Sequence, residues 1–180
     1  TASGELIMWD GAGTFLNRVQ VSDEEISSLT IVNKAAGAEA EIILSTGKQV
    51  CRLVIEAGAC TPIAVIEFNA EVTAYSFEPN LRVGIVGTSC CTVWKADLFI
   101  GDADALPEDP TKDTKAVRLF AGHSGYINQI THFPGELGLI GSCDSKGSLR
   151  VWQQSEVDQG WGSDQIMHFQ THEVGFVCVL

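Results

Sequence analysis

Basic residues are scarce in this chain. Its 180 residues include 11 Lys and Arg against 23 Asp and Glu, which gives a formal net charge of −12. Because affinity for a phosphate backbone comes from Lys and Arg, this balance argues against a general nucleic-acid binder. An acidic surface is compatible with a basic protein partner, although most acidic surfaces serve only solubility. We therefore expect the partners to be other proteins and not nucleic acid.

Long hydrophobic runs are also missing. No run approaches the roughly 18 apolar residues of a membrane span, and the first residues lack the basic start and apolar stretch of a secretory signal. The hydrophobic content is nevertheless 45%, which supports a packed core. Val, Ile and Leu are scattered in short runs, a pattern that favours strands over helices. The sequence thus predicts an all-β, cytoplasmic chain with no membrane partner.

The cysteines form neither a C-x-x-C pair nor a regular framework. They are Cys51, Cys60, Cys90, Cys91, Cys143 and Cys178. On a strand, the adjacent Cys90 and Cys91 would point to opposite faces. This spacing favours free, mostly buried thiols in a reducing compartment over a zinc site. We expect no metal and no cofactor.

A pattern of short strands and turns recurs along the chain. Its clearest copy runs from Gly122-His123 to Val151-Trp152. Three other segments share its turn and closing strand: 3–10, 46–53 and 87–97. The equivalent closing positions are Trp9, Leu53, Ala96 and Trp152, at intervals of 44, 43 and 56 residues. The long third interval contains an acidic insertion with two prolines, residues 101–115, and without it the period holds throughout.

This arrangement resembles the WD40 repeat, in which each unit of roughly 40–45 residues forms one blade of a β-propeller. The resemblance implies an all-β fold: a partial WD40-type β-propeller with about four blades of four-stranded antiparallel sheets. Residues 1–180 would divide into the end of one blade (1–25), three blades (26–70, 71–120 with the insertion, and 121–170) and the start of the next (171–180). Because closed propellers typically need 4–8 blades, we expect the rest of the same polypeptide to complete a larger propeller.

Apolar runs bounded by turn residues predict four strands in each blade. The first blade has them at 26–32, 40–44, 50–55 and 63–68, and the second at 72–77, 82–87, 92–98 and 116–120. The third blade has them at 127–132, 138–142, 148–153 and 166–170. A polar stretch, residues 154–164, is predicted to connect the last two strands.

In WD40 repeats, a hydrogen-bonded set of His, Ser, Trp and Asp fixes the entering loop against the sheet. By this resemblance, the structural motif residues are Trp9, Asp10, Asp97, His123, Ser142, Asp144 and Trp152. Asp144 lies a residue or two early, and Lys146 stands nearer to the position of the family's Asp. The expected role of the whole set is structural.

Three patterns that could carry chemistry fit poorly. Residues 122–126 half-match the G-x-S-x-G nucleophile elbow around Ser124, but the fifth residue is Tyr126 and a strand pattern follows. The acidic insertion has Pro107 where a calcium loop needs Gly. His168 and His172 are four residues apart but flank a strand connection instead of lying on a helix. The sequence therefore predicts no metal site and no enzyme.

Proteins of the WD40 family are mostly non-catalytic scaffolds. Loops and insertions supply the candidate partner contacts: Phe99, Asp102, Asp104, Glu108, Asp109 and Trp161. The run 80–89 followed by Val93-Trp94 is similar to blades in large microtubule-associated WD proteins of cilia, flagella and centrioles. The resemblance implies a scaffold of such a cytoskeletal assembly, with tubulin or microtubule-associated proteins as partners. The alternatives are an adaptor of a ubiquitin-ligase or trafficking complex, or a hydrolase that uses Ser124.

Overall fold

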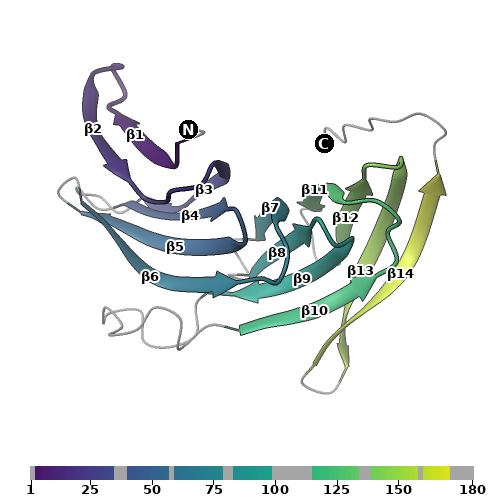
Figure 1. Cartoon of the computed structure of the whole chain (residues 1–180). Coiled ribbons are helices and arrows are strands. Elements are labelled where there is room, and N and C mark those ends of the chain that lie inside the picture. Colours follow the sequence, from purple (N-terminus) through teal and green to yellow (C-terminus); the bar gives the residue numbers. More distant parts are fainter. Residues whose placement is uncertain are drawn as a thin grey trace. The chain divides into compact units, whose positions relative to one another are not determined.

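The structure, a computed structural model, describes residues 3–34, 40–56, 59–78, 83–98, 115–133, 139–157 and 160–170. Every regular element in these ranges is a β-strand (Figure 1). The chain divides into two compact units, one formed by residues 1–69 and 98–114 and the other by residues 70–97 and 115–180. Each unit is described separately below.

The first unit contains a hairpin and a four-stranded antiparallel sheet. The hairpin consists of β1 (Glu5–Trp9) and β2 (Phe15–Gln20). The sheet has the order β3 (Ile26–Lys34), β4 (Ala40–Thr46), β5 (Gln49–Glu56), β6 (Ala59–Glu67). Its buried core is apolar: Ile42, Leu44, Cys51, Leu53 and Ile55. Leu6 and Met8 of β1 pack against this core, so the hairpin belongs to the same hydrophobic cluster.

The second unit contains two four-stranded antiparallel sheets. One is formed by β7 (Val72–Glu78), β8 (Val83–Thr88), β9 (Thr92–Asp97) and β10 (Lys115–Ala121). The other is formed by β11 (Ile127–His132), β12 (Leu139–Asp144), β13 (Ser148–Val157) and β14 (Gly160–Gln170). One buried cluster joins them: Val83, Ile85, Val93, Ile127, Ile130, Ile140 and Trp152.

The three four-stranded sheets share the same irregularity. Their first two strands begin with equivalent pairs: Ile26 with Thr46, Val72 with Thr88, and Ile127 with Asp144. In each sheet, the register shifts by one residue directly after this pair. Such a bulge bends the first strand and increases its local twist. The repeat is therefore one of detailed backbone geometry as well as of strand number.

The turn before the third strand also repeats. It holds a residue in the left-handed region in every sheet, with φ of 49° at Gly47, 61° at Cys91 and 78° at Gly147. Cys91 is the one residue other than Gly with a positive φ in the described part of the chain. The prediction that Cys90 and Cys91 share a strand is therefore wrong, since both lie in the β8–β9 turn.

The thiols that the structure describes are free, as expected. Two of the five are buried, Cys51 and Cys143, so the expectation of mostly buried thiols holds only in part. Burial raises the pKa of Cys51 to about 11, which keeps its thiol protonated and unreactive near neutral pH. Cys178 lies outside the described residues.

Most strands lie within a few residues of the predicted runs, but the predicted connection at 154–164 is wrong. There β13 and β14 extend into a long hairpin that pairs Gln153 with Asp164 and Val157 with Gly160. Antiparallel pairing rests on backbone hydrogen bonds, so a polar sequence without alternation can still form it. Likewise β6 begins at Ala59 and includes Pro62, which is tolerated because β6 is an edge strand.

Candidate functional site

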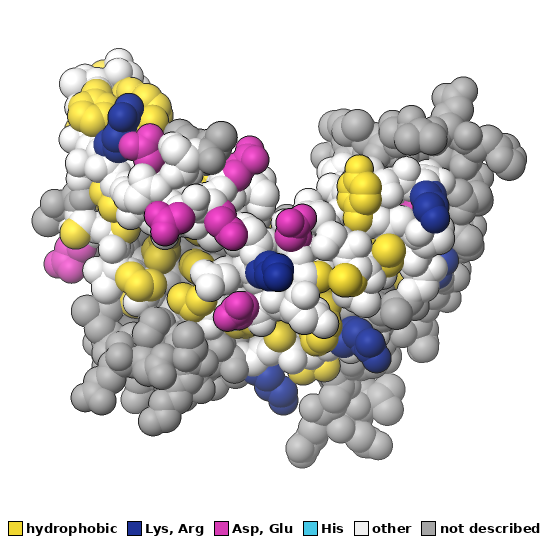
Figure 2. All heavy atoms as spheres, in the orientation of Figure 1, with side chains coloured by type: hydrophobic (Ala, Val, Ile, Leu, Met, Phe, Trp, Pro, Cys, Tyr) yellow, Lys and Arg dark blue, Asp and Glu magenta, His cyan; other side chains and the backbone are white. Residues whose placement is uncertain are grey.

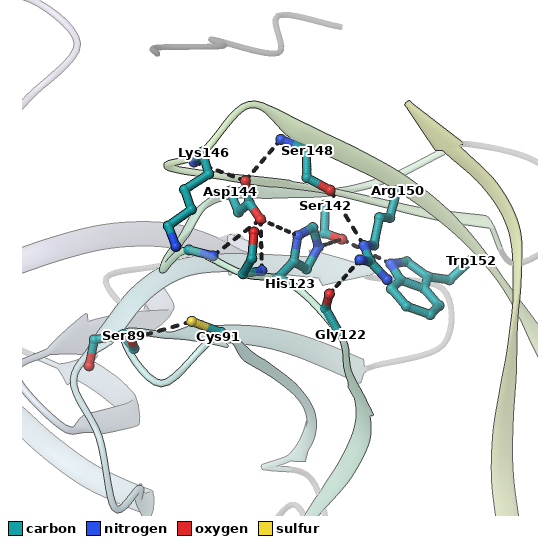
Figure 3. Close-up of polar contacts among 12 residues, drawn as sticks. Ser89, Cys91, Gly122, His123, Ser142, Asp144, Lys146, Ser148, Arg150 and Trp152 are labelled. Atoms are coloured by element: carbon teal, nitrogen blue, oxygen red, sulfur yellow. Dashed lines mark hydrogen bonds and ion pairs between the residues drawn. The ribbon is translucent and has the colours of Figure 1, made fainter. Parts of the chain in front are cut away.

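The densest cluster of buried polar side chains lies in the β11–β14 sheet (Figure 3). His123 comes from the loop before β11, and Ser142 and Asp144 come from the end of β12. The ring of His123 joins them, with Nδ1 3.1 Å from Asp144 Oδ2 and Nε2 2.7 Å from Ser142 Oγ. Trp152 of β13 completes the set by donating its Nε1–H to Ser142 Oγ at 2.9 Å.

The carboxylate of Asp144 is the most connected group in the cluster. Besides His123, Oδ2 accepts the backbone N–H groups of Ser124 at 3.2 Å and Gly125 at 3.3 Å. Oδ1 accepts those of Lys146 at 3.0 Å and Ser148 at 2.9 Å. One buried side chain thus holds both the loop that enters the sheet and the turn between β12 and β13.

These bonds decide the charge of Asp144. Burial raises the pKa of its carboxyl, but the Ser148 N–H, the His123 ring and the Lys146 N–H lower it by more in total. The net pKa lies below the ordinary value of 3.8, so Asp144 is ionised at neutral pH. Although sequence spacing places Lys146 nearer to the family's Asp position, it is Asp144 that binds His123, and Lys146 contributes a backbone N–H.

The acceptors fix the direction of every bond in the chain. A carboxylate can only accept, so His123 donates its Nδ1–H to Asp144, and Nε2 of the neutral ring is then an acceptor. Ser142 consequently donates its O–H to that nitrogen while accepting from Trp152. Bonds linked in this way polarise one another, which strengthens the set as a whole.

The same three residue types form catalytic triads in hydrolases, but this arrangement cannot act as one. Ser142 has 0% exposure, and its oxygen is already bonded to both His123 and Trp152. A nucleophile must instead reach the reacting atom of a substrate. The exposed Ser124 has no base at hand in His123, because both ring nitrogens of His123 are bonded within the network. The geometry of the set is that of a structural clasp.

The network also positions an exposed aromatic side chain. The loop from Gly122 to Tyr126 is tied to Asp144 through two N–H groups, and the carbonyl of Tyr126 accepts the N–H of Ser145 at 2.9 Å. The side chain of Arg150 bonds the carbonyl of Gly122 and lies 5.9 Å from the centre of the Trp152 ring. Tyr126 itself is 52% exposed. Sequence reasoning missed both Tyr126 and Arg150, because neither stands at a motif position.

A second polar contact joins β7 to β11. Ser76 Oγ lies 2.9 Å from His132 Nδ1, while His132 Nε2 and the hydroxyl of Tyr75 have no hydrogen-bond partner among the described residues. Burial lowers the pKa of His132 and Glu78 raises it, with burial the larger effect. No group of three or more potential metal ligands occurs in the part of the chain that the structure describes.

The remaining motif residues lie apart from this network. Asp10 caps the β1–β2 turn by accepting the N–H groups of Ala12 at 2.9 Å and Thr14 at 2.8 Å. Trp9 is 56% exposed, and Asp97 ends β9. The candidate partner contacts Phe99, Asp102, Asp104, Glu108 and Asp109 lie outside the described residues, as does His172. Trp161 lies on β14 and not in a loop.

The four-stranded antiparallel sheets and the bonded His–Asp–Ser–Trp set define the class of protein: the chain has the all-β fold of a partial WD40-type β-propeller. No helix in the described residues is long and apolar enough to cross a membrane.

Two known proteins resemble the chain in sequence. WD repeat-containing protein 90 of Homo sapiens is 29% identical over 87 residues, which are 48% of this chain and 4% of that protein. WD repeat-containing protein 90 of Mus musculus is 26% identical over 93 residues, 52% of this chain and again 4% of the relative. No family model matches the chain. Fold, bonded set and relatives together identify it as a member of the WD40-repeat family.

Proposed function

We propose that the protein is a non-catalytic scaffold that binds other proteins. The observation that carries this proposal is the use of His123, Ser142 and Asp144 to hold the loop that presents Tyr126. An aromatic side chain on a preordered loop loses little conformational entropy on binding, which is typical of the residues that dominate interface energies. WD-repeat proteins are generally scaffolds, which agrees with this reading.

The finer proposal is a structural role in a cilium, flagellum or centriole, in the cytoplasm at the cytoskeleton. Its support is the resemblance of the run 80–89 and Val93-Trp94 to blades of microtubule-associated WD proteins. The net charge of −12 favours a partner with a basic face or tail. Tubulin or a microtubule-associated protein is the partner class that we propose.

Cosedimentation of the purified chain with stabilised microtubules, alone and decorated with microtubule-associated proteins, tests the finer proposal. We expect binding that weakens as salt rises and that falls at least tenfold in Tyr126→Ala. Lys146→Ala is the matched control, since it alters a neighbouring exposed side chain and leaves the network in place. A chain that stays in the supernatant under every condition would contradict the cytoskeletal role.

The two alternatives predict different results. An adaptor of a ubiquitin-ligase or trafficking complex would bind purified subunits of that complex in preference to microtubules. A hydrolase would lose its activity in Ser124→Ala, whereas we expect wild-type protein and variant to be equally inactive in a hydrolase substrate screen. The engagement of both His123 nitrogens in the network supports that expectation.

A further inference from the structure

The four equivalent closing positions of the repeat differ sharply in exposure. Leu53, Ala96 and Trp152 are 5%, 0% and 5% exposed, whereas Trp9 is 56% exposed. Each of the three buried residues lies on a third strand that pairs on both sides. Trp9 lies on β1, which pairs only with β2 among the described residues. The exposure of Trp9 thus follows from one open strand edge.

The next sheet shows a matching gap. In the second unit, β11 packs against β7 and β8 of the preceding sheet, and Ile130 there is 5% exposed. Leu29 of β3 holds the place of Ile130, because each stands three residues after the first pair of its sheet. Leu29 is 43% exposed and Ile31 is 63% exposed. The first unit therefore lacks the two strands that would cover β3.

The two uncovered regions form one surface. An open groove is lined by β1 and β3, with Glu5, Leu6, Ile7 and Trp9 on one side and residues 26–29 on the other. Hydrophobic side chains also gather over the β1–β2 hairpin, at the upper left of Figure 2. An unpaired edge beside exposed apolar side chains is a template for strand addition.

Gly4 indicates how the missing strands connect. Its φ is 71°, and it lies five residues before Trp9, just as Gly147, with φ of 78°, lies five residues before Trp152. A Cβ at Gly4 would approach the carbonyl oxygens of Ser22 and Glu24, the latter at 2.6 Å. The backbone at Gly4 thus has the conformation of the turn that joins the second strand to the third in the complete sheets.

We infer that the edge of β1 and the uncovered face of β3 bind a β-hairpin of the β11–β12 kind, contributed by the same polypeptide through the turn at Gly4. The hairpin would turn β1–β2 into a four-stranded sheet and bury Trp9, Leu29 and Ile31. A two-stranded hairpin is marginally stable at best in water, so this addition would stabilise the first unit. The inference does not depend on the partner proposed above.

The test grafts such a hairpin onto the full chain. A copy of residues 121–146 is fused directly before Gly4, and in a second construction residues 71–90 take the same place. A scrambled extension of equal composition is the control. Acrylamide quenching of Trp9, taken as the difference between each protein and its Trp9→Phe variant, reports burial. Amide exchange in β1 and light scattering report strand pairing and self-association.

We expect a strongly quenched Trp9 in the chain alone and with the scrambled extension, and at least a threefold drop in quenching with one of the grafts. Amide exchange in β1 should slow in the same protein, which should be monomeric. Three results would overturn the inference: a Trp9 already shielded in the monomeric chain, a Trp9 shielded by dimerisation of the chain alone, or failure of both grafts to shield it.

Discussion

The β7–β10 and β11–β14 sheets form the same turn with different side chains. Thr88 and Asp144 hold the same position, each paired with the first residue of its sheet, and both are fully buried. Thr88 bonds only locally, to the carbonyl of Thr92 at 3.3 Å and its hydroxyl at 2.7 Å. Asp144 instead bonds a side chain and four backbone N–H groups.

The backbone of the turn is nevertheless equivalent in the two sheets. Ser89 N–H donates to Glu71 and Ser145 N–H donates to Tyr126, both at 2.9 Å. The closing position is filled equally well by Ala96 and by Trp152. Strand pairing and packing thus suffice to build the sheet, and the bonded set adds a fixed entering loop. The motif therefore governs the order of the loop at 122–126 more than the existence of the sheet.

Removing the carboxylate should break this comparison most strongly. In Asp144→Ala, His123 and several buried N–H groups lose their acceptor, and we expect a loss of about 3 kcal/mol in the free energy of unfolding. Urea denaturation of the variant measures it. A loss below about 1 kcal/mol would mean that the network is not what holds the loop.

Acid should separate the sheets next. Because the pKa of Asp144 is lower in the folded chain than its ordinary 3.8, the unfolded chain takes up this proton first as the pH falls. The stability that Asp144 provides is thus complete above pH 3.8 and decreases as the pH falls through the folded pKa. Melting curves from pH 6 to pH 2 should show a smaller acid-induced decrease in Asp144→Asn, and equal slopes would refute the assignment.

Trp152→Phe is expected to have a smaller effect. It keeps most of the apolar packing but removes the donor to Ser142, so we expect a loss of about 1–2 kcal/mol in urea denaturation. Trp94→Phe is a matched control in the neighbouring sheet, since Trp94 Nε1 donates at 2.9 Å to the partly buried Thr92. Equal losses in the two variants would remove the distinction between the sheets.

Thr88→Val should cost about 1 kcal/mol, because a short local pair of hydrogen bonds is lost and the volume is kept. Its effect should stay within the β8–β9 turn, as monitored by amide exchange. Faster exchange at Ser124 or Gly125 in this variant would show that the two sheets are coupled in a way that this comparison does not include.

Lys146→Ala should change least, by less than about 0.5 kcal/mol, since the network uses only the backbone N–H of this residue. Thermal melting of the variant beside wild type measures the difference. A loss comparable to that of Asp144→Ala would return the acidic position of the motif to question.

Much of this fold could be predicted from sequence, because each strand is a short apolar run between turn residues. His123, Ser142 and Trp152 were also found by spacing. The partner of His123 was harder to choose, since a difference of two residues between Asp144 and Lys146 is resolved only by the turn that follows β12. The left-handed Cys91 and the paired polar stretch at 154–164 depend on backbone geometry, which residue types do not reveal.

The tautomer of His123 tests the central claim most directly. A long-range proton–nitrogen correlation spectrum at pH 7 distinguishes the two ring nitrogens. We predict a proton on Nδ1, held by Asp144, and a bare Nε2 that accepts from Ser142. A proton on Nε2, or an imidazole that exchanges freely with solvent, would contradict the account of this set as a structural clasp.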